Sequence, residues 1–496
     1  MGNEQVLVNY WLPPDIEPSQ VFANTSLERP LGESGLCLEE ERPTPAGMSA
    51  LLHKLRSARR VRLAARSIDS IIQSLDQVAR EWLDPKLPER RLCIQAIHAF
   101  TGLSEAMIGH TLDLEMRSSL REGMERALER EVGDAKALDT FVPQRSLGGF
   151  THASGPELIG AIFSSNVPGL PHLTIMRSLL VKSACLGRTS RYEPIFLPLY
   201  VQTLARIDPE LASCLAVVHW PHEDMKVGGE FYRGVDHLIA WGGDAAHEQL
   251  ARRCPPELKI TRHGHRIGFA VVLRSALRHQ REALSLAHQL AYDFTVFEQH
   301  ACLAPQALYV EQGSDVSVEF FGRAMAESMD AWADVLPPRT LTRAEQAHLR
   351  NELEMIRMRR AMGEKVRLMT PPNRLQRVVT IEPAAQLQPS PGDRFVRIMP
   401  IRSWEFLPSL LEECRGRLQN VALAGEGGEA RRLRDTLARL GVSRICLPGR
   451  MGTPSMMWYH DGAPRLGELL RWTDVELETP GDAESGRRLS PRTTLP

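Results

Sequence analysis

A cysteine and a histidine lie close together in the segment FEQHACLAPQ, residues 297–306. A thiolate can attack a carbonyl carbon and hold the acyl group as a thioester, so Cys302 is a candidate nucleophile. The simpler interpretation is packing, because free cysteines are usually small buried hydrophobic residues. His300 is a poor candidate for the partner base, since side chains at i and i+2 point to different sides of a helix or a strand.

Metal binding is the third interpretation of Cys302, and the spacing of other ligand types argues against it. The eight cysteines lie at positions 37, 93, 185, 214, 254, 302, 414 and 446 and include no C-x-x-C pair. His263 and His265 in RHGHR have no cysteine or carboxylate at a spacing typical of zinc sites. We therefore predict no metal site, and reduced thiols of the kind found in a cytoplasmic protein.

Three further segments place polar or flexible residues beside apolar, strand-like runs. Asn166 in SSNVPGLP is either a turn residue or an amide donor for a developing oxyanion. Gly242 and Gly243 in AWGG lie between a strand pattern and a helix pattern, a layout that suits phosphate binding at a helix N-terminus. Lys182 in VKSAC is one of the few lysines and belongs either to a solvated loop or to a ligand site.

The elements that must position these residues are short apolar runs alternating with helical patterns. Residues 46–147 are mainly helical by their periodicity, and alternation begins after residue 148 with LIGAIF, LAVVHW, HLIAW and IGFAVVL. A second alternating block contains ALYVEQ, VVTIEP, FVRIMPI and NVALAG. Unbroken apolar strands between helices indicate parallel sheets covered on both faces, so we predict an α/β fold.

The domain boundaries that follow from this pattern divide the chain into five parts. We expect an irregular arm at 1–45, a helical layer with a first α/β domain at 46–275, a second α/β domain at 276–464, a short segment at 465–478 and a disordered tail at 479–496. Sixty basic residues face sixty-one acidic ones, which argues against nucleic acid as a partner. No apolar run reaches the length of a membrane span, so we expect a cytoplasmic protein.

Taken in order, these segments resemble the aldehyde dehydrogenase superfamily, and within it the LuxC-type fatty acyl-CoA reductases, over residues 156–474. The resemblance implies a Rossmann-type cofactor domain beside an α/β catalytic domain. It also implies a homo-oligomer that pairs through small elements near 141–156 and 465–478. By the same resemblance Cys302 is the nucleophile and Asn166 the oxyanion donor. The residues to which it gives a role in cofactor binding are Lys182, Ser183, Gly242, Gly243, Asp393 and Phe395.

Three departures from the superfamily pattern shape the expected chemistry. Arg262 stands where hydrolytic members carry a glutamate base, which argues for a thiol exchange followed by hydride transfer and against hydrolysis. Cys185 stands where many NAD-preferring members have a glutamate, so NADPH is the expected cofactor, with Lys182, Ser183 or Arg188 near its 2′-phosphate. His247 replaces the second glycine of the diphosphate turn, which leaves the geometry of that turn open.

The function that the resemblance implies is NADPH-dependent reduction of a long-chain fatty acyl-CoA to the fatty aldehyde through an acyl-S-Cys302 intermediate. Two alternatives stay open. The chain could be an acylating aldehyde dehydrogenase, or a reductase that takes its acyl group from a carrier protein or an acyl-protein ligase. It could also be a non-catalytic scaffold that binds acyl groups. Acyl chain length cannot be read from the sequence, because tunnel residues and core residues are of the same types.

Overall fold

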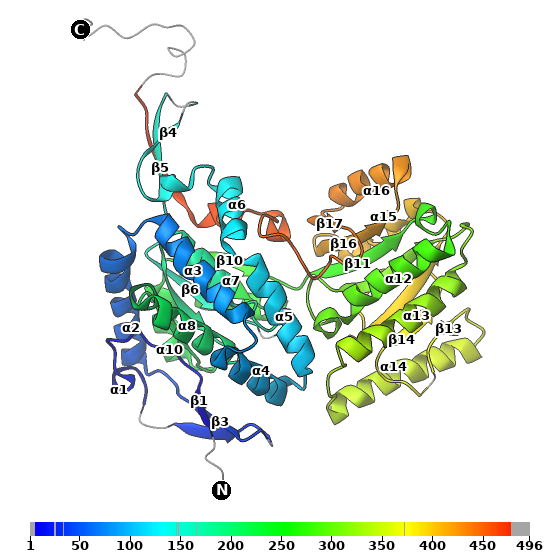
Figure 1. Ribbon diagram of the computed structural model, residues 1–496, viewed down its shortest axis with the longest axis horizontal. Coiled ribbons are helices and arrows are strands. Elements are labelled where there is room, and N and C mark those ends of the chain that lie inside the picture. The colour runs from blue at the N-terminus through cyan, green and yellow to red at the C-terminus, as the bar shows by residue number, and fades with distance from the viewer. Residues whose placement is uncertain are drawn as a thin grey trace, which may run out of the picture.

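The first of two α/β lobes is built on a five-stranded parallel sheet (Figure 1). The computed structural model describes residues 5–477 except positions 24, 25, 33, 145, 147, 165 and 372. The sheet order is β10-β9-β6-β7-β8, with β6 at Leu158–Ile162, β7 at Ala184–Arg188, β8 at Leu215–Val218, β9 at His237–Trp241 and β10 at Lys259–His263. The four strands β9, β6, β7 and β8 are largely apolar and buried because helices cover both faces of the sheet, whereas the edge strand β10 is mostly polar.

The helices of the first lobe bury one apolar face each. They are α2 Pro45–Ala58, α3 Ile68–Leu83, α4 Pro88–Thr101, α5 Glu105–Ser118, α6 Arg121–Glu131, α7 His172–Leu180, α8 Phe196–Ile207, α10 Met225–Gly234 and α11 Asp244–Arg253. In α3, Ser67 caps the N-terminus by accepting from the Ser70 amide, and Ile71, Leu75 and Trp82 are buried at helical spacing. The helices expected from periodicity before residue 148 are therefore confirmed.

The second lobe holds a seven-stranded sheet of order β13-β14-β15-β12-β11-β16-β17, parallel except for the edge strand β13. Its strands are β11 Ile267–Val272, β12 Pro305–Glu311, β13 Arg367–Leu368, β14 Val378–Ile381, β15 Phe395–Ile401, β16 Leu418–Ala424 and β17 Arg444–Cys446. Its main helices are α12 Gln280–Thr295, α13 Val318–Val335, α14 Arg343–Ala361 and α16 Gly427–Arg439. Because β11 pairs with β12 and β16, the lobe begins before residue 267, and the boundary predicted at 275 lies too late.

A three-stranded antiparallel sheet stands out from the first lobe, at the top of Figure 1. It pairs β4 Val142–Gln144 with β5 Gly149–Ser154, and β5 with β18 Arg471–Val475. The two segments expected to mediate oligomerisation are thus neighbours in one sheet. Large apolar side chains on it are exposed, among them Phe150 at 38% and Trp472 at 40%. Pairing between copies of the chain remains a prediction.

The N-terminal segment is more regular than its composition indicates. β1 Gln5–Val8, β2 Leu27–Pro30 and β3 Leu36–Glu40 form a small sheet, so the irregular arm predicted at 1–45 is wrong for these residues. Leu36, Cys37 and Leu38 are buried, which explains why so short a strand is held. The tail predicted at 479–496 lies outside the described residues. No helix within the described part of the chain combines the length and hydropathy needed to cross a membrane.

Candidate active site

Cys302 follows a backbone turn that is unusual for residues other than glycine. After α12, the residues Phe297, Glu298 and Gln299 have φ angles of +58°, +52° and +65°. Left-handed backbone costs about 1 kcal/mol or more per residue for L-amino acids, so other contacts must stabilise the turn. The turn ends three residues before Cys302 and therefore fixes the direction in which the loop approaches the cavity.

Two buried side chains of this turn supply those contacts. The Glu298 carboxylate accepts from Nε and Nη2 of Arg394 at 2.7 and 2.5 Å, and both side chains are fully buried. The Gln299 amide donates to the carbonyls of Pro305 and Phe395 at 2.8 and 3.0 Å and accepts from the Phe395 N–H at 2.8 Å. The loop is thereby fastened to the start of β15.

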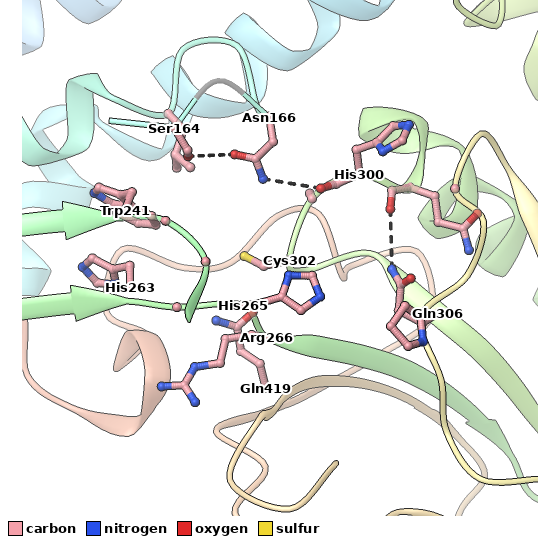
Figure 2. A pocket seen from close by; sticks show the side chains of 18 of the residues that line it. Ser164, Asn166, Trp241, His263, His265, Arg266, His300, Cys302, Gln306 and Gln419 are labelled. Atoms are coloured by element: carbon pink, nitrogen blue, oxygen red, sulfur yellow. Dashed lines mark hydrogen bonds between the residues drawn. The ribbon is translucent and has the colours of Figure 1, made fainter. Parts of the chain in front are cut away.

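A cavity of about 550 Å³ lies between the two lobes in front of Cys302 (Figure 2). Asn166, Gly242, Gly243 and Cys302 all line it, although they come from three distant segments of the chain. Four of the residues proposed from sequence are therefore brought together at the carboxyl ends of β6 and β9 and at the start of β12. For β6 and β9 this is the edge at which open α/β sheets bind their ligands.

Asn166 presents its amide toward the cysteine loop. Its Nδ2 donates to the His300 carbonyl at 3.4 Å, and its Oδ1 accepts from the Ser164 hydroxyl at 2.8 Å, as Figure 2 shows. The Ser164 contact orients the amide so that the N–H side faces the loop. An N–H group in this position can donate to an oxyanion that forms on a carbonyl attached to Cys302.

Gly242 and Gly243 join β9 to α11 in a turn that leaves space for a ligand to reach the backbone. Gly243 is the N-cap of α11 and gives no side-chain cap, and a Cβ added there would meet no atom within 4 Å. Free amides at a helix N-terminus attract phosphate. His247, which replaces the expected second glycine, turns its Nε2 toward the His263 carbonyl at 3.2 Å. The turn fits a dinucleotide diphosphate, with Asp244 as an opposing charge in the first helical turn.

The structure does not bring Lys182 and Ser183 to this cavity. Both are buried at the amino end of β7, where the Lys182 ammonium pairs with Asp139 at 2.6 Å. Ligands of open α/β sheets bind beyond the carboxyl ends of the strands, so the roles assigned to these two residues are not supported. Arg188 ends β7 at the correct edge, and Ser190 of the following loop lines the cavity.

Asp393 and Phe395 also lie outside the cavity lining. Phe395 is 1% exposed and packs in an apolar cluster with residues of α14. Asp393 accepts from Nε of Arg339 at 2.6 Å, and hydrogen bonds from His300 and Arg339 lower its pKa although burial opposes them. Ser390 of the preceding loop lines the cavity instead.

A second cavity, of about 370 Å³, reaches Cys302 from another direction. Its lining contains many apolar side chains, among them Leu114, Val167, Phe297, Met456 and Trp458. Cavities of this size and character commonly hold small organic ligands. The residues that line both cavities are Leu170, Trp241, Ala301, Cys302 and His460. Cys302 thus lies where the two spaces meet.

A charged cluster centred on Asp461 lies beside the cysteine and was given no role from sequence. The partners of the Asp461 carboxylate are Gln419 at 2.7 Å, Arg266 at 3.1 Å, His460 at 3.2 Å, His263 at 3.3 Å and Arg465 at 3.4 Å. Burial acts to raise the pKa of Asp461, but the contacts with His263 and His460 hold it far below its usual range. Asp461 is therefore an anion near neutral pH.

The surroundings of Cys302 keep its thiol protonated at rest. Burial, with the charge of Asp461 as a second cause, raises the pKa of Cys302 to about 12, while a hydrogen bond from Gln419 acts in the opposite direction. A thiol must lose its proton to become an effective nucleophile. Attack by Cys302 consequently needs a base or a change in its surroundings when a ligand binds.

Comparison with known proteins agrees with this geometry. The profile of the family described as acyl-CoA reductase (LuxC) matches residues 63–472. A long-chain acyl-protein thioester reductase of Photorhabdus laumondii is 25% identical over 274 residues, 54% of this chain and 55% of that protein, so the match spans about half of that relative. The reductase of the same description from Vibrio harveyi is 21% identical over 414 residues, 83% of each chain.

Comparison with solved structures identifies the fold class. Aldehyde dehydrogenase 21 from Physcomitrella patens, in complex with the product succinate, superposes with a TM-score of 0.69 at 11% identity, over 95% of this chain and 98% of that one. A mutant of aldehyde dehydrogenase C from Pseudomonas syringae, in complex with NAD+ and octanal, gives 0.69 at 13% identity, over 96% and 97%. At these identities the likeness shows the fold alone, and that fold is aldehyde-dehydrogenase-like.

Proposed function

The chain belongs to the acyl-CoA reductase (LuxC) family, and we propose that it reduces a long-chain fatty acyl thioester to the fatty aldehyde through an acyl-enzyme on Cys302. The observation that carries the proposal is the position of Cys302 where two cavities meet. One cavity has the phosphate-binding turn at Gly242 and Gly243, and the other is lined largely by apolar side chains. A hydride donor and an acyl chain can therefore approach the same sulfur from different directions.

In this mechanism the chain's own groups prepare and stabilise the acyl transfer. The Cys302 thiolate attacks the thioester carbonyl, and the donor thiol leaves. The Asn166 amide and the Cys302 backbone N–H donate to the oxyanion, where one such donor is worth about 3 kcal/mol. The apolar lining of the second cavity buries the alkyl chain at about 0.8 kcal/mol per CH₂ group, which favours long acyl groups.

We propose NADPH as the cofactor, which supplies the hydride when it is bound. Gly242 and Gly243 would hold its diphosphate. Two cations lie at the carboxyl end of β7. Arg188 is the last residue of the strand, and its Nε donates to the Trp220 carbonyl at 2.9 Å. Arg191, in the loop that follows, is exposed and stacks on Tyr192 at 4.6 Å. Exposed guanidinium groups suit a 2′-phosphate because they bind it by charge-assisted hydrogen bonds.

The position of Arg262 supports the proposal that the acyl group is reduced to the aldehyde and not hydrolysed. This residue occupies the place of the glutamate base of hydrolytic relatives and is exposed on β10, outside the lining of either cavity. The part of the first cavity's lining that the structure describes holds no carboxylate. Water near the acyl-enzyme therefore lacks an adjacent carboxylate base, and reduction is favoured over hydrolysis.

The donor of the acyl group is the second point on which we make a proposal. The sequence indicated free acyl-CoA as the donor. The names of the curated relatives instead favour a thioester carried by a protein. We infer that the acyl group is delivered by an acyl-protein partner and that acyl-CoA serves as a small substitute in the assay. The joint placement of Cys302 and Asn166 favours catalysis over a non-catalytic scaffold.

The test uses the purified full chain. Long-chain acyl-CoA without cofactor should add the acyl mass to the peptide that contains Cys302, and NADPH should then be oxidised with release of aldehyde. Cys302→Ala should abolish both signals, whereas Cys254→Ala, at a half-buried cysteine away from the cavities, should keep them. Full NADPH oxidation by Cys302→Ala would contradict the proposal. Comparison of acyl-CoA with an acyl-carrier protein as donor decides the source of the acyl group.

A further inference from the structure

His460 is placed to exchange a proton with Cys302. Both residues line the two cavities, so each borders the space that the donor thioester would enter. The Nδ1 atom of His460 lies 3.2 Å from the Asp461 carboxylate and 3.3 Å from Nη2 of Arg465. Its Nε2 atom makes no hydrogen bond to any residue that the structure describes. In the tautomer with its proton on Nδ1, directed at Asp461, the Nε2 atom is free to act as a base.

The ring of His460 is held by aromatic neighbours as well as by charge. It packs against Trp241, Trp458 and His263 with ring centroids at 5.4, 4.8 and 4.9 Å. A carboxylate that fixes one imidazole nitrogen and packing that fixes the ring plane are the features by which proteins orient a histidine base. The oriented ring needs no rearrangement when the substrate arrives.

We propose that His460 accepts the Cys302 proton during acyl transfer and returns it to the departing thiol, and that Asp461 is the residue that positions it. The inference rests on the proposed function and names a group in that reaction. The Cys302 S–H bond breaks as its proton moves to Nε2, and the sulfur forms a bond to the acyl carbon. The bond from the acyl carbon to the donor sulfur breaks, and that sulfur takes the proton from Nε2. No electrons are exchanged with a further reagent.

Gln419 connects the two ends of this arrangement. Its side chain lines the first cavity together with Cys302, and its Nε2 donates to Asp461 at 2.7 Å. Its Oε1 is buried without a hydrogen-bond partner among the described residues. The Gln419 amide, the Asp461 carboxylate and the His460 ring thus form one connected network beside Cys302 at the junction of the cavities.

The charges that face His460 keep it neutral and therefore able to act as a base. Burial is the main cause that lowers its pKa, and the charges of Arg465 and Arg177 act in the same direction against Asp461. The neighbouring His263 has its own pKa lowered to about 3 and is also neutral. A base must be unprotonated at the working pH, and His460 meets that condition near neutrality.

The other histidines near Cys302 suit this role less well. His300 is 41% exposed and directs its Nε2 to Asp393 at 3.4 Å. His263 stacks on Trp241 at 3.9 Å and lines the first cavity only. His265 is exposed and has no acidic partner among the described residues. His460 combines an acidic partner with a place in both cavities.

A metal ion is the alternative occupant of this cluster. Ligand atoms of His263, His460 and Asp461 lie within 4.8 Å of one another. However, Arg266 and Arg465 already place guanidinium groups 3.1 and 3.4 Å from the same carboxylate. Two fixed cations beside the only anionic member of the group repel a divalent ion. The cluster is therefore better suited to orient a proton carrier than to bind a metal.

The experiment measures the rate of Cys302 acylation by a long-chain acyl-CoA in the absence of NADPH, by mass spectrometry of the whole chain across pH. The wild-type rate should level off near neutral pH, where His460 is unprotonated. His460→Asn should acylate about a hundredfold more slowly or worse, and its rate should keep rising about tenfold per pH unit because hydroxide must then remove the thiol proton. Imidazole should partly restore His460→Ala, and His348→Gln, at an exposed histidine on α14, should match the wild type.

Two results would overturn the role of His460. One is a wild-type rate in His460→Asn. The other is a loss that shows neither the altered pH profile nor rescue by imidazole, which would identify a merely structural contribution. A wild-type chain that no acyl thioester modifies would instead refute the proposed function, so the two failures are distinguishable.

Discussion

Replacing Asp461 by Asn should change two reactions of Cys302 in opposite directions. The charge of Asp461 raises the pKa of the Cys302 thiol, so its removal should lower that pKa and increase the thiolate population. The guanidinium groups of Arg266 and Arg465 stay in place, and their positive charges also favour the thiolate. The same substitution removes the anion that positions His460, so acyl transfer should become slower while simple alkylation becomes faster.

The size of the alkylation effect is bounded by the structure. A pKa of about 12 in place of the ordinary 9.0 leaves about a thousandfold less thiolate on Cys302 at pH 7. Burial is the larger cause and is unchanged by the substitution, so Asp461→Asn should recover only part of that factor, about tenfold. Acyl transfer should fall by about tenfold to a hundredfold, because the base stays present but loses its orientation.

The assay follows iodoacetamide labelling of the Cys302 peptide and single-turnover acylation in the same preparations. Asp435→Asn, at an exposed aspartate on α16 that has no described partner, serves as the matched control and should change neither rate. Alkylation that is slower than in the wild type would show that the charge of Asp461 does not raise the pKa of the Cys302 thiol. Acylation that accelerates together with alkylation would show that the thiolate population alone sets the rate and that positioning of His460 is irrelevant.

Three further outcomes are expected. Glu298→Gln should lower the free energy of unfolding in urea by about 3–5 kcal/mol, because it leaves Arg394 buried without its counter-ion, whereas Glu122→Gln in an exposed pair should cost less than about 1 kcal/mol. Equal losses in the two variants would contradict this. Arg191→Ala should weaken NADPH binding in fluorescence titrations by about tenfold or more and leave NADH binding unchanged; a parallel loss for both cofactors would remove Arg191 from the 2′-phosphate site. Trp472→Asp should reduce the mass measured by light scattering if the exposed antiparallel sheet joins copies of the chain; an unchanged mass would place the contact elsewhere.

The residues that could be located from sequence are those with a local signature. Asn166, Gly242 and Gly243 follow apolar strand patterns directly, and the end of a parallel strand lies at the ligand-binding edge. Cys302 lies between a long helical pattern and a strand pattern. For these residues a correct assignment of the neighbouring element is enough to bring them to the cavity.

The residues that were misplaced needed information that no local pattern contains. Lys182 is next to β7 in sequence but at its amino end, so a shift of a few residues moves it to the opposite edge of the sheet from Arg188. Phe395 has the same residue type whether it faces a cofactor or the apolar cluster beside α14. Asp461 reaches Cys302 from a distant loop, where its own backbone is left-handed at φ +59°.

Two carboxylates lie near Cys302, and the state of each bears on whether it can activate water there. Among the described lining residues of the second cavity, Glu115 is the carboxylate. Burial raises the pKa of Glu115 to about 8, so at pH 7 it carries a proton and cannot accept one from water. Asp461 is ionised, but its oxygens are engaged by two guanidinium groups, two histidines and Gln419. Neither carboxylate can therefore accept a proton from water beside an acyl group on Cys302 at neutral pH, which favours reduction over hydrolysis.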